Sequence, residues 1–478
     1  MVEAKIPAEN GVKKLLLAAF LLAGCTVGPD YTRPEAEVPE QFKEAQGWRA
    51  ASPSDALPRG DWWTVFGDAE LDALMKRVDV SNFNLRAAEA RVRQARALSD
   101  QARAGYFPTI GAGATAARSK SPSLPNAPTT TSAVNTYSAS VNASWELDLW
   151  GRVRRAVEAG DATWQASAAD LETARLSARA SLAQSYFTLR ITDAFHQILE
   201  DTVAAYERSL ELTRNRYNAG VAARVDVVQA EVQWKSAQAQ LVDLGVDRSQ
   251  LEHAIALLVG EPPSKFSLER KPLTLAMPDV PLALPSALLE RRPDIAAAER
   301  SVAAANARIG VAKAAFFPTL TLSGAGGFRS VDAADLFLAP SRFWSLGAQL
   351  AQPIFDGGAR SAASDQALAA YDEQVALYRQ AVLTGFQEVE DNLAALRILG
   401  DEARVQEEVV QAARKNVELT MNQYRAGVVS YLNVILAQAT LLQNERTAAQ
   451  LLGRRLTASI NLVRAAGGGW TAEELPHR

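Results

Sequence analysis

Residues 136–148 read Thr-Tyr-Ser-Ala-Ser-Val-Asn-Ala-Ser-Trp-Glu-Leu-Asp. Apolar and polar side chains alternate here without interruption, a period of two that a β-strand produces and an α-helix does not. The apolar face would carry Tyr137, Ala139, Val141, Ala143, Trp145 and Leu147. The other face would carry only Ser, Asn, Thr and Glu side chains. The segment therefore predicts a strand with one apolar and one hydrophilic face.

Three further segments have the character of strands. Residues 109–117 would pair with the first strand, residues 319–328 place Leu320, Leu322 and Phe328 on one face, and residues 343–355 do the same for four apolar side chains. We expect the apolar faces to contact lipid, at Tyr137, Val141, Trp145, Leu320, Leu322, Trp344 and Leu346. Aromatic residues near strand ends are typical of a bilayer interface. The alternative is core packing in a soluble sandwich.

The chain repeats itself. Residues 104–109, Ala-Gly-Tyr-Phe-Pro-Thr, return at 314–319 as Ala-Ala-Phe-Phe-Pro-Thr. Residues 216–221, Arg-Tyr-Asn-Ala-Gly-Val, return at 423–428 as Gln-Tyr-Arg-Ala-Gly-Val. Because the order of the other segments also matches, we interpret residues 83–290 and 291–466 as two copies of one structural unit.

Each copy contains very long helical stretches. A first helix, about 83–105 or 294–315, ends at a Phe-Pro pair, because proline disfavours helix in the residue before it. Residues 152–218 and 359–426 contain no proline, and their apolar residues recur with coiled-coil spacing towards the far end. A Gly-containing reversal then begins a returning helix, 221–260 or 428–466.

The N-terminus predicts export and acylation. Lys13-Lys14, an apolar run and Leu22-Ala23-Gly24-Cys25 describe a signal peptide, residues 1–24, cut before the only cysteine of the chain. That pattern resembles a bacterial lipobox, so Cys25 would carry a covalent lipid and lie on a membrane surface. Thr26 is not the Asp that retains enteric lipoproteins in the inner membrane, which favours the outer membrane. The alternative is a plain signal peptide.

Four strands per chain are too few to close a barrel, since the smallest transmembrane barrels use eight. Three chains would supply twelve strands and a continuous wall. Helices of about 65 residues would extend roughly 100 Å and continue that wall as a second tube. The expected fold class is mainly α with membrane β: a trimeric 12-stranded barrel, four strands per chain, continued by an α-helical barrel and internally duplicated.

Composition excludes several function classes. A formal net charge of −4 without a basic arm argues against nucleic acid as a partner. One cysteine excludes an internal disulfide and a thiol metal site. The histidines, His196, His253 and His477, are scattered, and no catalytic constellation or metal-binding pattern is present. We therefore expect no enzyme activity and no cofactor other than the lipid on Cys25.

The motifs together resemble the TolC-like outer-membrane efflux factor family, in its lipoprotein branch. They are Cys25 to Pro34, Trp62-Trp63 with Phe66-Gly67-Asp68, Arg291 to Ile295, Ala303 to Gly310, Phe317-Pro318, both Tyr-X-Ala-Gly reversals and Gly467-Gly468-Gly469-Trp470. The resemblance implies a homotrimer in the outer membrane with a periplasmic tunnel. It also implies a collar formed by residues 25–82 and 467–478, and as partners a periplasmic adaptor and an inner-membrane pump.

The resemblance also implies where the channel closes. The reversals would dock the adaptor at Gly220, Val221, Gly427 and Val428, and Tyr424 and Asn433 match constriction residues of relatives. Many relatives carry an Asp where this chain has Leu436, and the nearest acid here is Asp226. The expected gate is therefore Tyr424, Arg425, Asn433 and Asp226, with Arg425 paired to Asp226 across neighbouring helices.

The expected function is a passive exit duct for drugs or other small molecules in a tripartite efflux system. One alternative is a duct for type I protein secretion. Another, of a different class, is a lipid-anchored periplasmic coiled-coil scaffold, which would conduct no ions.

Overall fold

The structure, a computed structural model, describes residues 26–39, 41–44, 61–120, 133–271, 291–470 and 474–476. The predicted signal peptide and the predicted lipidation site at Cys25 lie outside the described residues. The principal elements are α2 (Ala69–Ser81), α3 (Phe83–Ala104), β1 (Thr109–Ser119), β2 (Val134–Leu147), α4 (Arg152–Asn218), α5 (Arg224–Leu258), α7 (Pro293–Ala314), β3 (Thr319–Ser330), β4 (Arg342–Ala351), α8 (Ala359–Arg425) and α9 (Tyr431–Ala465).

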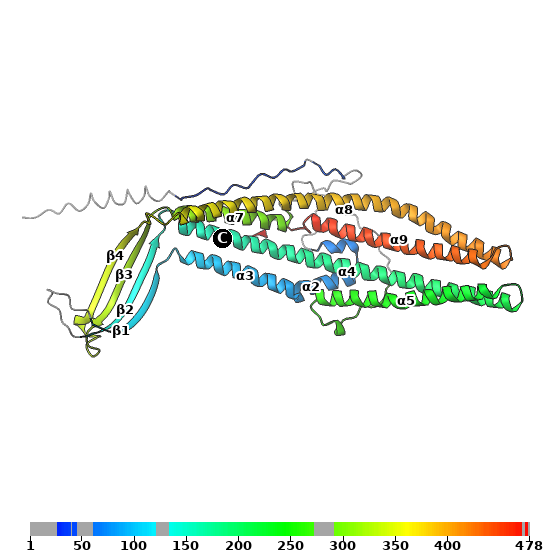
Figure 1. The fold of residues 1–478 in the computed structure, drawn as a ribbon, viewed down its shortest axis with the longest axis horizontal. Coiled ribbons are helices and arrows are strands. Elements are labelled where there is room, and N and C mark those ends of the chain that lie inside the picture. Colours follow the sequence, from blue (N-terminus) through cyan, green and yellow to red (C-terminus); the bar gives the residue numbers. More distant parts are fainter. Residues whose placement is uncertain are drawn as a thin grey trace, which may run out of the picture. The chain divides into compact units, whose positions relative to one another are not determined.

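The strands form one antiparallel sheet in the order β1-β2-β3-β4. Figure 1 shows them side by side, with the helices joining the sheet at one end and the β1–β2 and β3–β4 connections at the other. We call these the helix end and the loop end. β1 and β4 are the edges, and within the described chain neither has a partner on its outer side.

The pairing register collects the apolar side chains on one face. Val141 pairs with Ala112 on β1 and Gly326 on β3, and Gly326 pairs with Trp344 on β4. Because side chains two residues apart share a face, all seven residues predicted to contact lipid lie on this side. The opposite face carries Ser140, Asn142 and their polar neighbours. The predicted alternation is therefore confirmed for β2, and the apolar side chains predicted to share a face on β3 and β4 do so.

Several element ends differ from those predicted. β4 ends at Ala351 rather than 355, since Pro353 has no N–H for a ladder hydrogen bond. β2 ends at Leu147, and Asp148 instead accepts the backbone N–H groups of Val153 and Arg154 at the start of α4. The helices predicted at 221–260 and 428–466 begin three residues later, at Arg224 and Tyr431.

The two halves of the chain contain the same elements in the same order. α3 and α7 have 22 residues each, α4 and α8 have 67 each, and α5 and α9 have 35 each. The structure divides into two compact units, and each unit combines segments from both halves. Among the described residues, no helix has both the length and the hydropathy required to cross a membrane.

In the unit that contains the sheet, the N-terminal segment is fixed beside the helix end. Val27 donates its N–H to the carbonyl of Trp150, just after β2. Gly28 approaches Gly310 so closely that a Cβ on Gly28 would lie 2.5 Å from the Gly310 Cα. Tyr31 donates a hydrogen bond to Glu299, and burial together with that carboxylate raises the pKa of Tyr31. The segment that begins at residue 26 is therefore held near the sheet.

The second unit contains a helix that the sequence analysis did not separate from the N-terminal segment. α2 begins after Asp68, whose carboxylate accepts the N–H groups of Glu70 and Leu71 as a helix cap. The preceding aromatic residues Trp62 and Trp63 are almost completely buried. The C-terminal Trp470 is also buried, against alanines of α4 and α7. The predicted collar segments therefore contribute large aromatic side chains to this unit's core.

Candidate functional site

The candidate site lies at the two reversals, which share one backbone design. Gly220 and Gly427 have φ angles of 76° and 77°, in the left-handed region that glycine adopts without a steric penalty. Val221 donates its N–H to the carbonyl of Arg216, and Val428 donates to that of Gln423. With the hydrogen bonds from Gly220 and Gly427, this is the Schellman ending of a helix. Each long helix therefore stops at its glycine.

The returning helices begin with matched caps. Asp226 accepts the backbone N–H of Ala223 at 3.3 Å, three residues before it. Asn433 occupies the same place in the second copy, and its side-chain amide donates to the Ser430 hydroxyl at 3.2 Å. Both polar side chains therefore stabilise the first turn of their own helix.

Tyrosines fill the space between two helical hairpins, one formed by α4 and α5 and the other by α8 and α9. Tyr424 and Tyr431 are 3% and 1% exposed, and their ring centroids are 5.3 Å apart. They form one cluster with Leu210, Ala230 and Val434. The Tyr424 hydroxyl lies 3.3 Å from that of Thr213 on α4, and burial raises the pKa of Tyr431. The α4–α5 and α8–α9 hairpins of one chain are thus joined by a buried core.

Arg216 joins the two hairpins on the polar side. Its guanidinium carbon lies 4.8 Å from the centroid of the Tyr424 ring, a cation–π geometry. Its Nη1 also donates a 2.8 Å hydrogen bond to the backbone carbonyl of Arg425, at the end of α8. A cation at this point satisfies a carbonyl that the helix leaves unpaired and faces the negative end of the helix dipole.

The residues predicted to form a gate differ in their exposure. Tyr424 lies in the core of the chain, Arg425 and Asn433 are exposed, and Asp226 is half-buried. Among the ion pairs between described residues of one chain, none joins Arg425 to Asp226. The pair between Arg425 and Asp226 across neighbouring helices therefore remains a prediction.

The residues predicted for adaptor docking are all accessible. Gly220 and Gly427 are exposed, and the side chains of Val221 and Val428 are 64% and 72% exposed. These valines present apolar surface at the turning points, where the Schellman motif leaves them outside both helices.

The sequence analysis missed the role of Arg216. Its position carried a signal, because a basic side chain in the last turn of a helix is suited to bind orphan carbonyl groups. The comparison of the two copies did not indicate this role, because the second copy has Gln423 at the position that matches Arg216.

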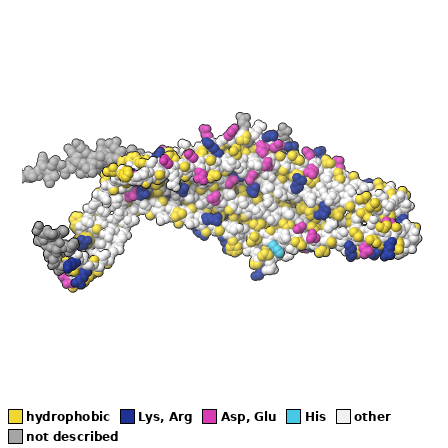
Figure 2. Space-filling view, in the orientation of Figure 1, with side chains coloured by type: hydrophobic (Ala, Val, Ile, Leu, Met, Phe, Trp, Pro, Cys, Tyr) yellow, Lys and Arg dark blue, Asp and Glu magenta, His cyan; other side chains and the backbone are white. Residues whose placement is uncertain are grey.

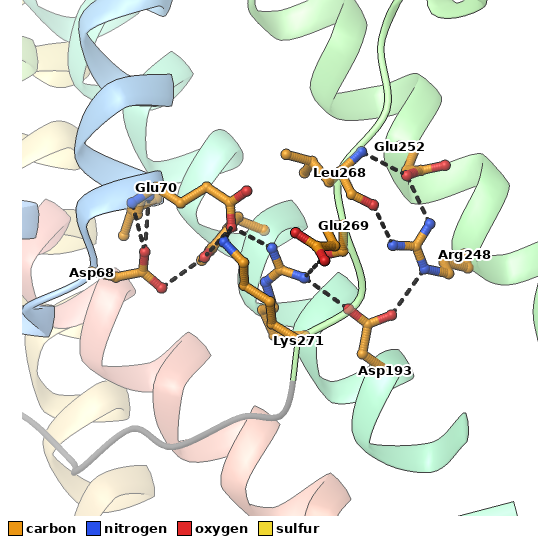
Figure 3. Close-up of polar contacts among 11 residues, drawn as sticks. Asp68, Glu70, Asp193, Arg248, Glu252, Leu268, Glu269 and Lys271 are labelled. Carbon is orange, nitrogen blue, oxygen red and sulfur yellow. Dashed lines mark hydrogen bonds and ion pairs between the residues drawn. The ribbon is translucent and has the colours of Figure 1, made fainter. Parts of the chain in front are cut away.

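A second polar cluster holds α2, α4, α5 and the segment after α5 together (Figure 3). Arg190 on α4 is 2% exposed and donates hydrogen bonds to Asp193, to Glu70 and to the carbonyl of Glu269. Arg248 on α5 contacts the other oxygen of Asp193 at 2.9 Å. Each buried charge is therefore paired.

Further groups complete this cluster. Arg248 also pairs with Glu252 at 2.7 Å and donates to the carbonyl of Leu268. Tyr186 donates to Asp68 at 2.6 Å, and burial followed by this carboxylate contact raises the pKa of Tyr186. The N-terminus of α2 is thereby fixed to the middle of α4.

A known protein family matches most of this chain. The model of the family described as "Outer membrane efflux protein" matches residues 74–261 and 284–468, which include both reversals and the whole sheet. The chain belongs to the outer membrane efflux protein family.

Relatives of this efflux protein match it over nearly their full length. The toluene efflux pump outer membrane protein TtgC of Pseudomonas putida is 34% identical over 95% of each chain. The pyoverdine export outer membrane protein OpmQ of Pseudomonas aeruginosa is 34% identical over 96% of this chain and 97% of its own. The solved structure of the outer-membrane channel OprN is 30% identical, with a TM-score of 0.87 over 93% of this chain and 100% of that one. The predicted family, efflux function and outer-membrane location are confirmed.

The contacts of Arg216 generate the first prediction. Arg216→Ala removes the cation–π contact and the hydrogen bond to Arg425, together worth about 1–2 kcal/mol. We expect amide hydrogen exchange in residues 421–434 to accelerate roughly five- to thirty-fold. The matched control is Arg214→Ala, because Arg214 makes only an exposed 3.8 Å contact with Glu231. Unchanged exchange in Arg216→Ala would contradict the role assigned to this residue.

The Arg190 cluster generates the second prediction. Arg190→Ala removes a buried cation from between Asp193 and Glu70 and leaves them only Arg248 and the more exposed Lys271 as partners, which we expect to destabilise the protein by about 3 kcal/mol. Thermal unfolding of the detergent-solubilised protein, followed by circular dichroism, measures this loss. Arg404→Ala serves as the control. Arg404 and its partner Asp401 are 73% and 69% exposed, so this substitution should lower the unfolding midpoint only slightly. Equal midpoints for the two variants would refute the assignment.

Proposed function

We propose that this protein is the outer-membrane duct of a tripartite efflux system, acting as a homotrimer. Three sheets would form a 12-stranded barrel, and the long helices would continue it as a periplasmic tunnel. A periplasmic adaptor and an inner-membrane pump would deliver small molecules to the tunnel.

The unpaired edges of the sheet carry this proposal. β1 and β4, of 11 and 10 residues, present backbone N–H and C=O groups that have no partner in the described chain. In hydrocarbon such groups must be hydrogen-bonded, which for strands requires a closed barrel. Four strands are fewer than the smallest known barrels contain, so β1 of one chain would pair with β4 of the next. We propose that three copies related by cyclic symmetry close the ring with twelve strands.

The two faces of the sheet support the same orientation. The apolar face exposes Trp344 and Leu346, at 80% and 81%, as expected of side chains that contact lipid outside a barrel. The opposite face, with Ser138, Ser140 and Asn142, would line an aqueous lumen. This alternation is the pattern of outer-membrane strands.

The reversals support a closable end. α4 and α8 each contain 67 residues, equivalent to about 100 Å of helix, and they end at the exposed valines of the two hairpins. We infer that the adaptor binds at Gly220, Val221, Gly427 and Val428. Because Arg216 and Tyr424 join the hairpins within each chain, opening would require either loss of these contacts or movement between chains.

The names of relatives support small molecules as cargo. TtgC is named for toluene efflux and OpmQ for pyoverdine export. We therefore propose drugs or other small organic molecules as cargo for this chain.

The lipid on Cys25 is part of the proposal. Val27 is fixed to Trp150 at the helix end of the sheet, two residues beyond Cys25. An acylated Cys25 would therefore insert into the leaflet at that end, beside the barrel.

The third prediction tests assembly and conduction. The purified full-length protein should have three times the mass of the mature chain in detergent and should conduct ions in planar bilayers. The mature N-terminus should be an acylated Cys25 by mass spectrometry. A monomer, or a protein that never conducts, would contradict the duct and favour a lipid-anchored scaffold.

The fourth prediction tests the orientation of the sheet with neighbouring residues of β2. Val141→Arg places a cation on the apolar face and should destabilise the inserted protein by about 2–4 kcal/mol if it lies near the bilayer midplane. Asn142→Arg changes the opposite face and should be tolerated far better. The yield of folded trimer and its unfolding midpoint measure the difference. Equal effects of the two substitutions would argue against lipid contact on the Val141 side.

A further inference from the structure

A hollow of about 610 Å³ lies on the apolar face of the sheet, towards the loop end. Its floor consists of Ala112, Ala114, Ala139, Val141 and Gly326 on three strands, and Val141 stands between Ala112 and Gly326 in the register. Phe328 and Phe337 form one wall, with ring centroids 5.5 Å apart in an edge-to-face arrangement. The hollow is a shallow, open depression of the sheet surface.

The neighbouring strand β4 carries two large apolar side chains on the same face. Trp344 pairs with Gly326 in the register, and Leu346 lies two residues further along the same face. Both side chains are at least 80% exposed, so they project beside the hollow instead of filling it. A Cβ at Gly326 would meet only the backbone oxygen of Phe343, at 3.8 Å. Apart from Val141, which is 51% exposed, the floor residues are therefore small.

Two cations lie on the same face as the hollow. Arg342 pairs with Phe328 in the register, and Arg118 lies four residues, roughly 13 Å, beyond Ala114 on β1. Both are exposed, and neither forms an ion pair with another described residue. An arginine on a lipid-facing position is unfavourable unless it reaches the headgroup level or meets an anion.

The charges around the loop end favour an anion. Figure 2 shows Lys and Arg side chains gathered there, while the strands themselves show few charges. The described charged residues of this end are Arg118, Lys120, Arg329, Arg342, Asp332 and Asp335. Arg329 lies on the opposite face, with its guanidinium carbon 5.0 Å from the ring centroid of Phe343. The excess positive charge on the apolar face thus comes from Arg118 and Arg342.

We propose that this hollow binds one phosphorylated, multiply acylated lipid of the outer leaflet per chain. An acyl chain would lie between Phe328 and Trp344, over the floor of alanines and Gly326, and the phosphates would contact Arg118 and Arg342. The proposal rests on the proposed function, which places the helix end in the periplasm and the loop end in the outer leaflet. The lipid of Cys25 is a poor occupant, because Val27 is fixed at the helix end.

Native mass spectrometry of the delipidated full-length trimer tests the proposal. The probes are lipid A, a phosphorylated glucosamine disaccharide with several acyl chains, its dephosphorylated form, and phosphatidylethanolamine. We expect one lipid A per chain, bound at least tenfold more tightly than the other two. The double variant R118Q/R342Q should lose the preference for phosphate, and Gly326→Leu should weaken binding of both forms by filling the hollow. Arg329→Gln is the matched control on the opposite face and should bind like the unaltered protein.

The outcomes are separable. Equal binding of the three lipids by the unaltered protein, or an unchanged preference in R118Q/R342Q, would overturn the lipid site. Conductance of the same samples in planar bilayers reports on the barrel independently of the lipid. A conducting trimer without lipid preference would refute this site alone, whereas a protein that forms no trimer and conducts no ions would refute the proposed duct.

Discussion

The structure depends on the hydrogen bonds that a four-stranded sheet cannot make by itself. Three strand pairs are complete within the chain, and the outer sides of β1 and β4 are left without a partner. An exposed edge of this length would normally be shortened, charged or covered, because it invites pairing with another chain. β1 instead consists mainly of Ala, Gly and Thr, with its only charge at Arg118. The edge is therefore suited to pairing with another chain, as the proposed trimer requires.

Away from the sheet, buried polar clusters hold the helices together. A bundle of long alanine-rich helices offers little that distinguishes one register from another. Arg190 and Arg248 bind the two oxygens of Asp193 from different helices, so a shift of α4 against α5 would leave buried charges unpaired. We infer that this cluster specifies the alignment of the helices, while the tyrosine core near Tyr424 specifies how the hairpins meet.

Much of the fold follows from periodicity alone. The alternation in residues 136–148 and the absence of proline from 152–218 predict β2 and α4 almost to the residue, because both patterns are long and unambiguous. The predicted strand ends are wrong where a single side chain determines the end of the strand, as Pro353 does after β4 and Asp148 does after β2. The site was only partly predictable. The glycines indicated both reversals, but the burial of Tyr424 and the role of Arg216 depend on contacts between segments about 200 residues apart.

The two reversals show what a repeated motif determines and what it does not. Tyr217 and Tyr424 precede identical Schellman endings, yet Tyr217 is 42% exposed and Tyr424 is 3% exposed. The backbone is the same because Gly220 and Gly427 impose it. Tyr424 is buried because it packs in a core with Leu210, Ala230, Tyr431 and Val434, and Arg216 extends over its ring. The second copy has Gln423 at the position that matches Arg216, and the structure gives it no such contact with Tyr217. Both turns remain exposed at Val221 and Val428, so the repeat determines the backbone of the turn, whereas the side chains packed behind each turn determine which tyrosine is buried.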